Sequence, residues 1–245
     1  MATHLSVNVN KVATLRNTRH NGIPSVVRAA QLALDAGAAG ITVHPRPDQR
    51  HIRPHDVEDI SRLLMRYPRA ELNIEGNPFH GLLDYARRFR PHQCTLVPDA
   101  AEAFTSNQGY DLANEGEPLR AVIREMKSLG CRVSLFMDAI PERMTLAPAF
   151  GPDRVELYTE PYANASTVTP SAEAVQPYAR AAAEAQRLGL GVNAGHDLSL
   201  HNLPFFLTHV RGVSEVSIGH ALIAEALEYG IPETVRRYLA ICATG

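Results

Sequence analysis

The sequence predicts a (β/α)₈ barrel, and three observations lead to that fold class. Eight short apolar runs rich in branched residues recur along the 245 residues, amphipathic stretches separate them, and several of those stretches end in glycine. Parallel strands need crossover helices, so strand and helix alternating eight times are typical of this barrel. No break in composition interrupts the pattern, so we expect one domain over residues 1–245. A doubly wound open sheet is the alternative, but no GxGxxG turn follows the first run.

The expected strands are short runs, most of them rich in Val, Ile and Leu, and they cover residues 5–9, 40–44, 71–75, 93–97, 132–138, 154–159, 190–195 and 215–219. The helical patterns cover 25–37, 54–67, 79–89, 119–130, 139–150, 172–189, 200–210 and 221–230, and an extra helix over 232–242 closes the chain. Gly37, Gly130 and Gly189 end three of these helices, because glycine accepts the left-handed conformation found there. We expect residues 14–24 to form a long first loop.

The composition excludes several classes of protein. A hydrophobic content of 45%, a charged content of 20% and a net charge of −2 are those of an ordinary globular protein. No basic face suggests a nucleic-acid partner. Cys94, Cys131 and Cys242 lie far apart, so we expect reduced thiols rather than disulfides or a zinc knuckle. The chain starts directly in a strand pattern, so we expect no signal peptide, no membrane span and a cytoplasmic location.

Polar residues gather where the strands end, which is the functional face of such a barrel. The strand ends and the segments after them provide Asn8, Asn10, Lys11, His44, Arg46, His51, Glu75, Asp138, Glu156, Thr159, Asn193, His196 and His220. One such residue is often structural, but ionisable groups at nearly every strand end are hard to explain as packing. We therefore predict that these side chains meet at one site.

Glu75 and two histidines are the predicted acid–base groups. The alternation in ELNIE places Glu75 toward the barrel axis, where burial would set the pKa of a general base. A structural ion pair with an arginine is the alternative for Glu75. His44 and His196 end two other strands, and histidine titrates near neutral pH, so both suit proton transfer.

Two groups of residues are predicted to hold anions. Gly219-His220 stands between a strand and a helix, where free backbone N–H groups bind phosphate, and AGHDLS after the seventh strand is its neighbour. Arg46 and His51, with Arg19 from the first loop, form the second group, because arginine matches phosphate oxygens. A solvated surface is the alternative for that group. Two phosphate sites around acid–base groups suggest two phosphorylated substrates in one cavity.

Residues 98–118 after the fourth strand have little apolar periodicity. Long segments at a barrel mouth are often lids, and Thr105 could reach a phosphate when such a lid closes. A disordered connector is the alternative.

Seven stretches resemble the pyridoxine 5′-phosphate synthase family of vitamin B6 biosynthesis, in the family's order and over nearly the whole chain: SVNVNKVATLRNTR, GAAGITVHPRPDQRHI, LNIEG, PHQCTLVPD, RVELYTEPYA, LGLGVNAGHDLSLHN and EVSIGHALI. The resemblance implies condensation of 1-deoxy-D-xylulose 5-phosphate with 3-amino-2-oxopropyl phosphate. Pyridoxine 5′-phosphate forms, and inorganic phosphate and water leave. It also implies that no metal or organic cofactor takes part, and that eight copies assemble into an octamer.

The resemblance also implies residue roles. His44 and Glu75 match proton acceptors, His196 a proton donor, and Glu156 a carboxylate that stabilises developing charge. The contacts to the amino-ketone phosphate match Asn8, Arg19, Asp197, Gly219 and His220, and those to the sugar phosphate match Arg46, His51 and Thr105.

This chain departs from the family's usual pattern at two places. Asn10-Lys11 stands where Asp-His is common, so Lys11 would supply a cation and Asn10 a hydrogen bond. Asp197 stands where glycine is common, and we expect it to cap the following helix.

Three rival functions remain on the same fold. A Schiff-base aldolase would need a central lysine, and only Lys11 is suitably placed. A metal-dependent hydrolase could use His44, Glu75, His196 and His220 as ligands. A non-catalytic phosphate-binding barrel would bind both substrates without forming product.

Overall fold

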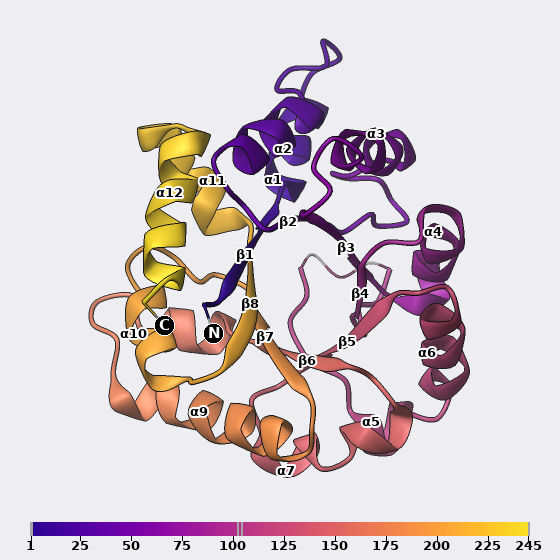
Figure 1. Cartoon of the computed structure of the whole chain (residues 1–245), viewed down its shortest axis with the longest axis vertical. Coiled ribbons are helices and arrows are strands. Elements are labelled where there is room, and N and C mark those ends of the chain that lie inside the picture. The colour runs from indigo at the N-terminus through magenta and orange to yellow at the C-terminus, as the bar shows by residue number, and fades with distance from the viewer. Residues whose placement is uncertain (1, 102, 104, 245) are drawn as a thin grey trace.

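In the computed structural model, which describes residues 2–101, 103 and 105–244, eight parallel strands close into a barrel in chain order (Figure 1). They are β1 His4–Asn8, β2 Gly40–Val43, β3 Glu71–Gly76, β4 Gln93–Leu96, β5 Arg132–Met137, β6 Arg154–Tyr158, β7 Gly191–Gly195 and β8 Val213–Ile218. β8 pairs in parallel with β1, with Leu5 opposite Val216, and this pairing closes the barrel. The predicted fold class is confirmed, and each strand overlaps its predicted range.

Helices surround the barrel (Figure 1). They are α1 Asn10–Asn17, α2 Val26–Asp35, α3 Pro54–Leu64, α4 Leu82–Phe89, α5 Leu112–Glu115, α6 Leu119–Ser128, α7 Pro141–Met144, α8 Glu160–Ala165, α9 Ala172–Arg187, α10 Leu203–His209, α11 His220–Tyr229 and α12 Ile231–Cys242, with 3₁₀ turns η1 Pro78–His80 and η2 Ala147–Phe150. The predicted extra C-terminal helix is α12, which packs beside α2 and β1. No helix in the described part of the chain is long and apolar enough to cross a bilayer.

The first connection was predicted wrongly as a loop. Residues 10–17 form α1, whose buried face is Val12, Ala13 and Arg16. The helical period is hidden in the sequence because an arginine is rarely a buried member of an apolar stripe. Here Arg16 is buried because its guanidinium pairs with the buried carboxylate of Asp56 on α3. The single helix predicted over 139–150 is also wrong, since this region is divided into α7 and η2.

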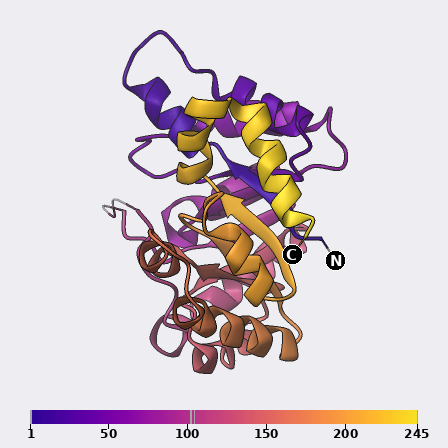
Figure 2. The same ribbon diagram turned by 90° about the vertical axis from the view of Figure 1, so that its left-hand side faces the viewer.

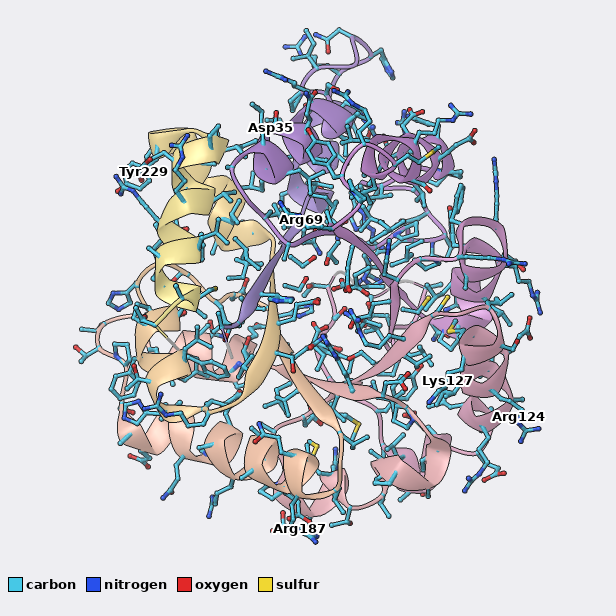
Figure 3. The ribbon with its side chains drawn as sticks, in the orientation of Figure 1. Asp35, Arg69, Arg124, Lys127, Arg187 and Tyr229 are labelled. Atoms are coloured by element: carbon cyan, nitrogen blue, oxygen red, sulfur yellow. The ribbon has the colours of Figure 1, made fainter. Side chains whose placement is uncertain are left out.

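Strand alternation sends aliphatic side chains outward to the helices and polar side chains into the barrel. A common barrel interior is filled by branched aliphatic residues. Here hydrogen bonds link the interior side chains: Ser6 to Thr42 at 2.7 Å, Thr42 to Asn73 at 3.3 Å, Asn73 to Thr95 at 3.1 Å, and Thr95 to Glu156 at 3.4 Å. Figure 3 shows side-chain oxygen and nitrogen atoms inside the ring of strands. Polar groups therefore surround the barrel axis below the mouth.

A charged layer closes the end of the barrel where the strands begin. Glu215 lies 3.6 Å from Arg154 and 3.9 Å from Arg132, and Gln93 donates to it at 3.1 Å. Asn193 belongs to this layer, because it accepts a hydrogen bond from Arg154 at 3.0 Å, so its predicted place at the mouth is wrong. In Figure 2 both termini lie at this end, and the β8 arrow points away from it toward the mouth.

Candidate active site

His44 lies directly after β2, between two buried carboxylates. Its Nδ1 is 3.7 Å from Glu75 Oε2 and its Nε2 is 3.8 Å from Asp99 Oδ2. The side chain of Asn10, at the start of α1, accepts a hydrogen bond from the His44 backbone N–H at 3.0 Å. This hydrogen bond ties the start of α1 to the end of β2. Both distances exceed hydrogen-bond length, so the imidazole lies near two carboxylates without being bonded to either in the free protein.

Glu156 lies in the interior layer below Glu75. Burial, followed by the charges of Glu75 and Glu215, raises the pKa of Glu156 well above the usual value, so its surroundings favour the protonated carboxyl group over the carboxylate. Thr95 donates to Oε2, while Oε1 has no hydrogen-bond partner in the described structure. Gly195 leaves the room for this oxygen, since a Cβ there would lie 2.6 Å from it.

His196 follows β7 and packs on two aromatic rings. Its ring centroid is 4.8 Å from that of Phe136 and 5.7 Å from that of Tyr158. Burial lowers the pKa of His196 and outweighs the opposite effect of the nearby Glu75 carboxylate. The ring is therefore neutral at pH 7, and its buried Nδ1 has no partner among the described residues.

Asp197 does not cap a helix, so that prediction is wrong. The next helix, α10, begins six residues later at Leu203 and has Asn202 at its N-cap position. Asp197 is exposed, and both His196 (φ 84°) and Asp197 (φ 59°) adopt left-handed backbone conformations. Glycine adopts this conformation without strain, so an aspartate at position 197 is the less favourable choice for this turn.

Cationic side chains gather on the β2 side of the mouth. Arg46 is buried and donates to Asp99 Oδ2 at 2.5 Å and to the Ala103 carbonyl at 3.1 Å. Burial, followed by the charges of His44, Arg46, Arg50 and Lys11, lowers the pKa of His51 to about 3. The neutral His51 ring therefore stands among cations, in an environment suited to a phosphate.

The N-terminus of α11 lies where the other anion site was predicted. Gly219 occupies its N-cap position and His220 is its first residue, as predicted. A Cβ at Gly219 would lie 3.2 Å from the Cβ of Asn8, so the end of β1 lies against this helix start. Arg19 and Thr105 are exposed on loops, and among the described residues neither side chain hydrogen-bonds to the buried groups.

Asp99 is the main residue that the sequence reasoning missed. It lies 3.8 Å from His44, pairs with Arg46, and accepts a hydrogen bond from Ser106 at 2.7 Å. Its place shortly after the fourth strand was the only available signal. Asp138, named as a strand-end residue, is instead structural: it accepts from the Gly109 N–H at 2.9 Å and pairs with Arg143 at 3.0 Å.

The geometry bears on two of the rival chemistries. Within residues 2–101, 103 and 105–244, no three His, Cys, Asp or Glu side chains form a group that could hold a metal ion. Lys11 is exposed at the start of α1, on the His51 side of the mouth, rather than at the barrel centre.

Residues 5–244 match the family model described as pyridoxal phosphate biosynthesis protein PdxJ. A pyridoxine 5′-phosphate synthase of Albidiferax ferrireducens is 54% identical over 250 residues, which cover 100% of this chain and 99% of the relative. One of Xylella fastidiosa is 55% identical over 246 residues, covering 98% and 94%. The chain belongs to the PdxJ family. The predicted family is confirmed, and with it pyridoxine 5′-phosphate synthesis as the predicted activity.

Solved structures of other proteins share the PdxJ-family barrel. Tryptophan synthase from Mycobacterium tuberculosis aligns with a TM-score of 0.67 at 13% identity, covering 100% of this chain and 94% of the other. Thiamine phosphate pyrophosphorylase from Pyrococcus furiosus gives 0.63 at 12% identity, covering 98% and 95%. At such identities the likeness shows the fold alone.

Proposed function

We propose that this barrel condenses 1-deoxy-D-xylulose 5-phosphate with 3-amino-2-oxopropyl phosphate, and that the residues at its mouth carry the reaction. The observation that supports this most is the position of His44 between the Glu75 and Asp99 carboxylates, at 3.7 and 3.8 Å. Anion-binding groups flank it on two sides. Holding two open-chain phosphates together in one cavity removes much of the entropic barrier to ring formation.

The first bond forms between the two substrates, without an enzyme lysine. The amine of the amino ketone adds to the ketone of the sugar phosphate, and loss of water gives an imine. Glu75 accepts the protons that leave nitrogen and carbon, and His44 passes them to the departing oxygens. Inorganic phosphate leaves in a later step, before the ring closes with loss of water.

His196 and Glu156 act later on the same intermediate. The neutral His196 ring takes up a proton and delivers it to the hydroxyl group that leaves as water. Glu156 stabilises positive charge that develops on nitrogen, because a cation nearby lowers the raised pKa of this buried carboxyl group and favours its carboxylate form.

The two phosphates bind on opposite sides of His44. Arg46, His51 and Lys11 hold the phosphate of the sugar, with Asp99 releasing Arg46 as the phosphate arrives. Asn8, the backbone N–H groups at Gly219-His220, and Arg19 hold the phosphate of the amino ketone. Asn10 supports the site through the His44 backbone, and Asp197 contributes its backbone N–H.

The segment 98–118 closes over the substrates and brings Thr105 to the sugar phosphate. Closure keeps bulk water from hydrolysing the imine. Arg46 and Arg50 both donate hydrogen bonds to the Ala103 carbonyl at 3.1 Å, and this supports the proposal. A phosphate bound at Arg46 would compete for these donors and so change the contacts of the segment.

Assembly and location complete the proposal. We infer that eight copies form an octamer in the cytoplasm, and exposed apolar side chains such as Leu227 (80% exposed) and Val168 (86%) offer surfaces for it. Light scattering coupled to size-exclusion chromatography would give a mass eight times 26.8 kDa; a monomer mass would contradict the octamer.

The direct test mixes the purified chain with both phosphates. Pyridoxine 5′-phosphate should appear by absorbance and mass, with one inorganic phosphate released for each product molecule. Borohydride added during turnover should leave the protein mass unchanged. A reduced adduct on Lys11 would favour the aldolase, and binding of both substrates without product would favour a non-catalytic barrel.

A further inference from the structure

Thr159, the residue after β6, makes contacts that its position does not explain. It stands at the N-cap position of α8, where a threonine hydroxyl normally accepts a hydrogen bond from the backbone of its own helix. Here the hydroxyl makes no such bond. It lies 2.6 Å from the carbonyl oxygen of Gly195 and 2.6 Å from that of His196, and shares its hydrogen between them.

The backbone that Thr159 contacts is strained. His196 and Asp197 are consecutive non-glycine residues with φ of 84° and 59°. Such residues persist in the left-handed region only where their surroundings hold them there. The Thr159 N–H also donates to the Gly195 carbonyl at 2.9 Å, and the Asn202 amide donates to the Asp197 carbonyl at 3.2 Å. Thr159 itself is completely buried.

The direction of the His196 side chain depends on this turn. With φ at 84°, the ring lies against Phe136 and Tyr158. A relaxed backbone at His196 would turn the ring away from these aromatic rings, because φ sets the direction of the Cα–Cβ bond relative to the strand.

We propose that Thr159 is a positioning residue for His196: its hydroxyl holds the strained turn that keeps the imidazole against Phe136 and Tyr158. The proposal rests on the proposed role of His196 in proton transfer. Because the Thr159 side chain is completely buried, its loss should lower kcat through His196 and leave phosphate binding nearly unchanged.

Two substitutions separate the hydroxyl from the shape of the side chain. Thr159→Val keeps the volume and removes the hydrogen bonds, whereas Thr159→Ser keeps the hydroxyl. We expect kcat to fall at least tenfold in Thr159→Val, with KM for both substrates within threefold of wild type, and to return to within threefold in Thr159→Ser. Equal kcat in Thr159→Val and wild type, or equal losses in both variants, would overturn the proposal.

Thr234 gives a matched control for a general effect on stability. It is completely buried on α12, away from the mouth, and its hydroxyl donates to the Gly230 carbonyl at 3.0 Å. Thr234→Val should lower the melting temperature about as much as Thr159→Val while kcat stays at the wild-type value. A kcat loss in Thr234→Val as large as that in Thr159→Val would mean that destabilisation alone explains the effect.

Relief of the strain gives a second, independent readout. In an Asp197→Gly background the turn needs less support, so the loss caused by Thr159→Val should shrink at least threefold in a double-mutant cycle. Purely additive effects would contradict the strain argument. His196→Asn, measured in parallel, tests the role of His196 itself. If this variant keeps full turnover, the proposed role of His196 fails. If His196→Asn is inactive while Thr159→Val is fully active, only the positioning role of Thr159 is overturned.

Discussion

At the scale of single residues, the proposed sugar-phosphate site depends on the ion pair between Arg46 and Asp99. Both side chains are buried. The Asp99 carboxylate forms an ion pair with the Arg46 guanidinium, the group that we propose binds the phosphate. A buried charge whose partner is removed costs about 3–5 kcal/mol, whereas a pair can be exchanged for another anion at a smaller cost. Asp99 therefore keeps Arg46 stable in the free protein and gives it up when the substrate binds.

This exchange predicts a specific effect of Asp99→Asn. The variant should lose about 3 kcal/mol of unfolding free energy without ligand, because Arg46 then lacks its counter-charge. Saturating inorganic phosphate should restore more of that stability in the variant than it adds to wild type. Urea denaturation with and without phosphate measures both terms, and equal phosphate effects in the two proteins would show that Asp99 and phosphate do not compete.

At the scale of elements, the conformation of the connection from β2 to α3 depends on contacts from α1. Arg16 pairs with Asp56 and donates to the His51 carbonyl at 3.1 Å, and Asn17 donates to the same carbonyl at 2.9 Å. Asp56 also accepts from the Arg53 N–H at 2.8 Å, where α3 begins. The helix that the sequence reasoning missed is therefore the one that shapes the cationic side of the mouth.

Asn17→Ala should loosen this loop without leaving a buried charge. We expect KM for the sugar phosphate to rise about fivefold, equivalent to about 1 kcal/mol, while KM for the amino ketone stays within twofold. Steady-state kinetics with each substrate varied in turn gives the two values. A rise in both KM values, or in neither, would show that α1 does not control this side selectively.

The strands could be predicted from the sequence because each contains a short run of apolar residues between helical patterns, and in several of them, such as β3, apolar and polar residues alternate. Glu75 was placed correctly for that reason. Two features were not predictable: α1, because its buried stripe includes Arg16, and Asp99, because its contact with Arg46 joins residues 53 apart through an irregular segment. Both depend on pairing of buried charges across elements, which has no period along the chain. The left-handed turn at His196 is likewise a tertiary feature.

At the scale of the whole molecule, the half-buried His51 at the mouth makes stability depend on pH. His51 titrates at about 3 in the folded protein, against 6.5 in an unfolded chain. A group whose pKa is lowered by folding contributes stability that is present above 6.5. That contribution is lost as the pH falls toward 3, because the unfolded chain binds the proton first.

His51→Asn should therefore flatten the acid side of the stability curve. Between pH 6.5 and 4.5 we expect wild type to lose up to about 1 kcal/mol per pH unit more than the variant. Urea denaturation at several pH values in a buffer without phosphate measures the difference. Parallel curves for the two proteins would mean that His51 titrates normally in the folded state.

The central claim is that the acid–base groups at the barrel mouth, rather than substrate binding alone, carry the condensation, and Glu75→Gln tests it most directly. Calorimetric titration of the variant with each phosphate substrate should give a Kd within about threefold of wild type. Product formation followed by absorbance should fall at least about a hundredfold. Turnover close to the wild-type rate in Glu75→Gln would contradict the account.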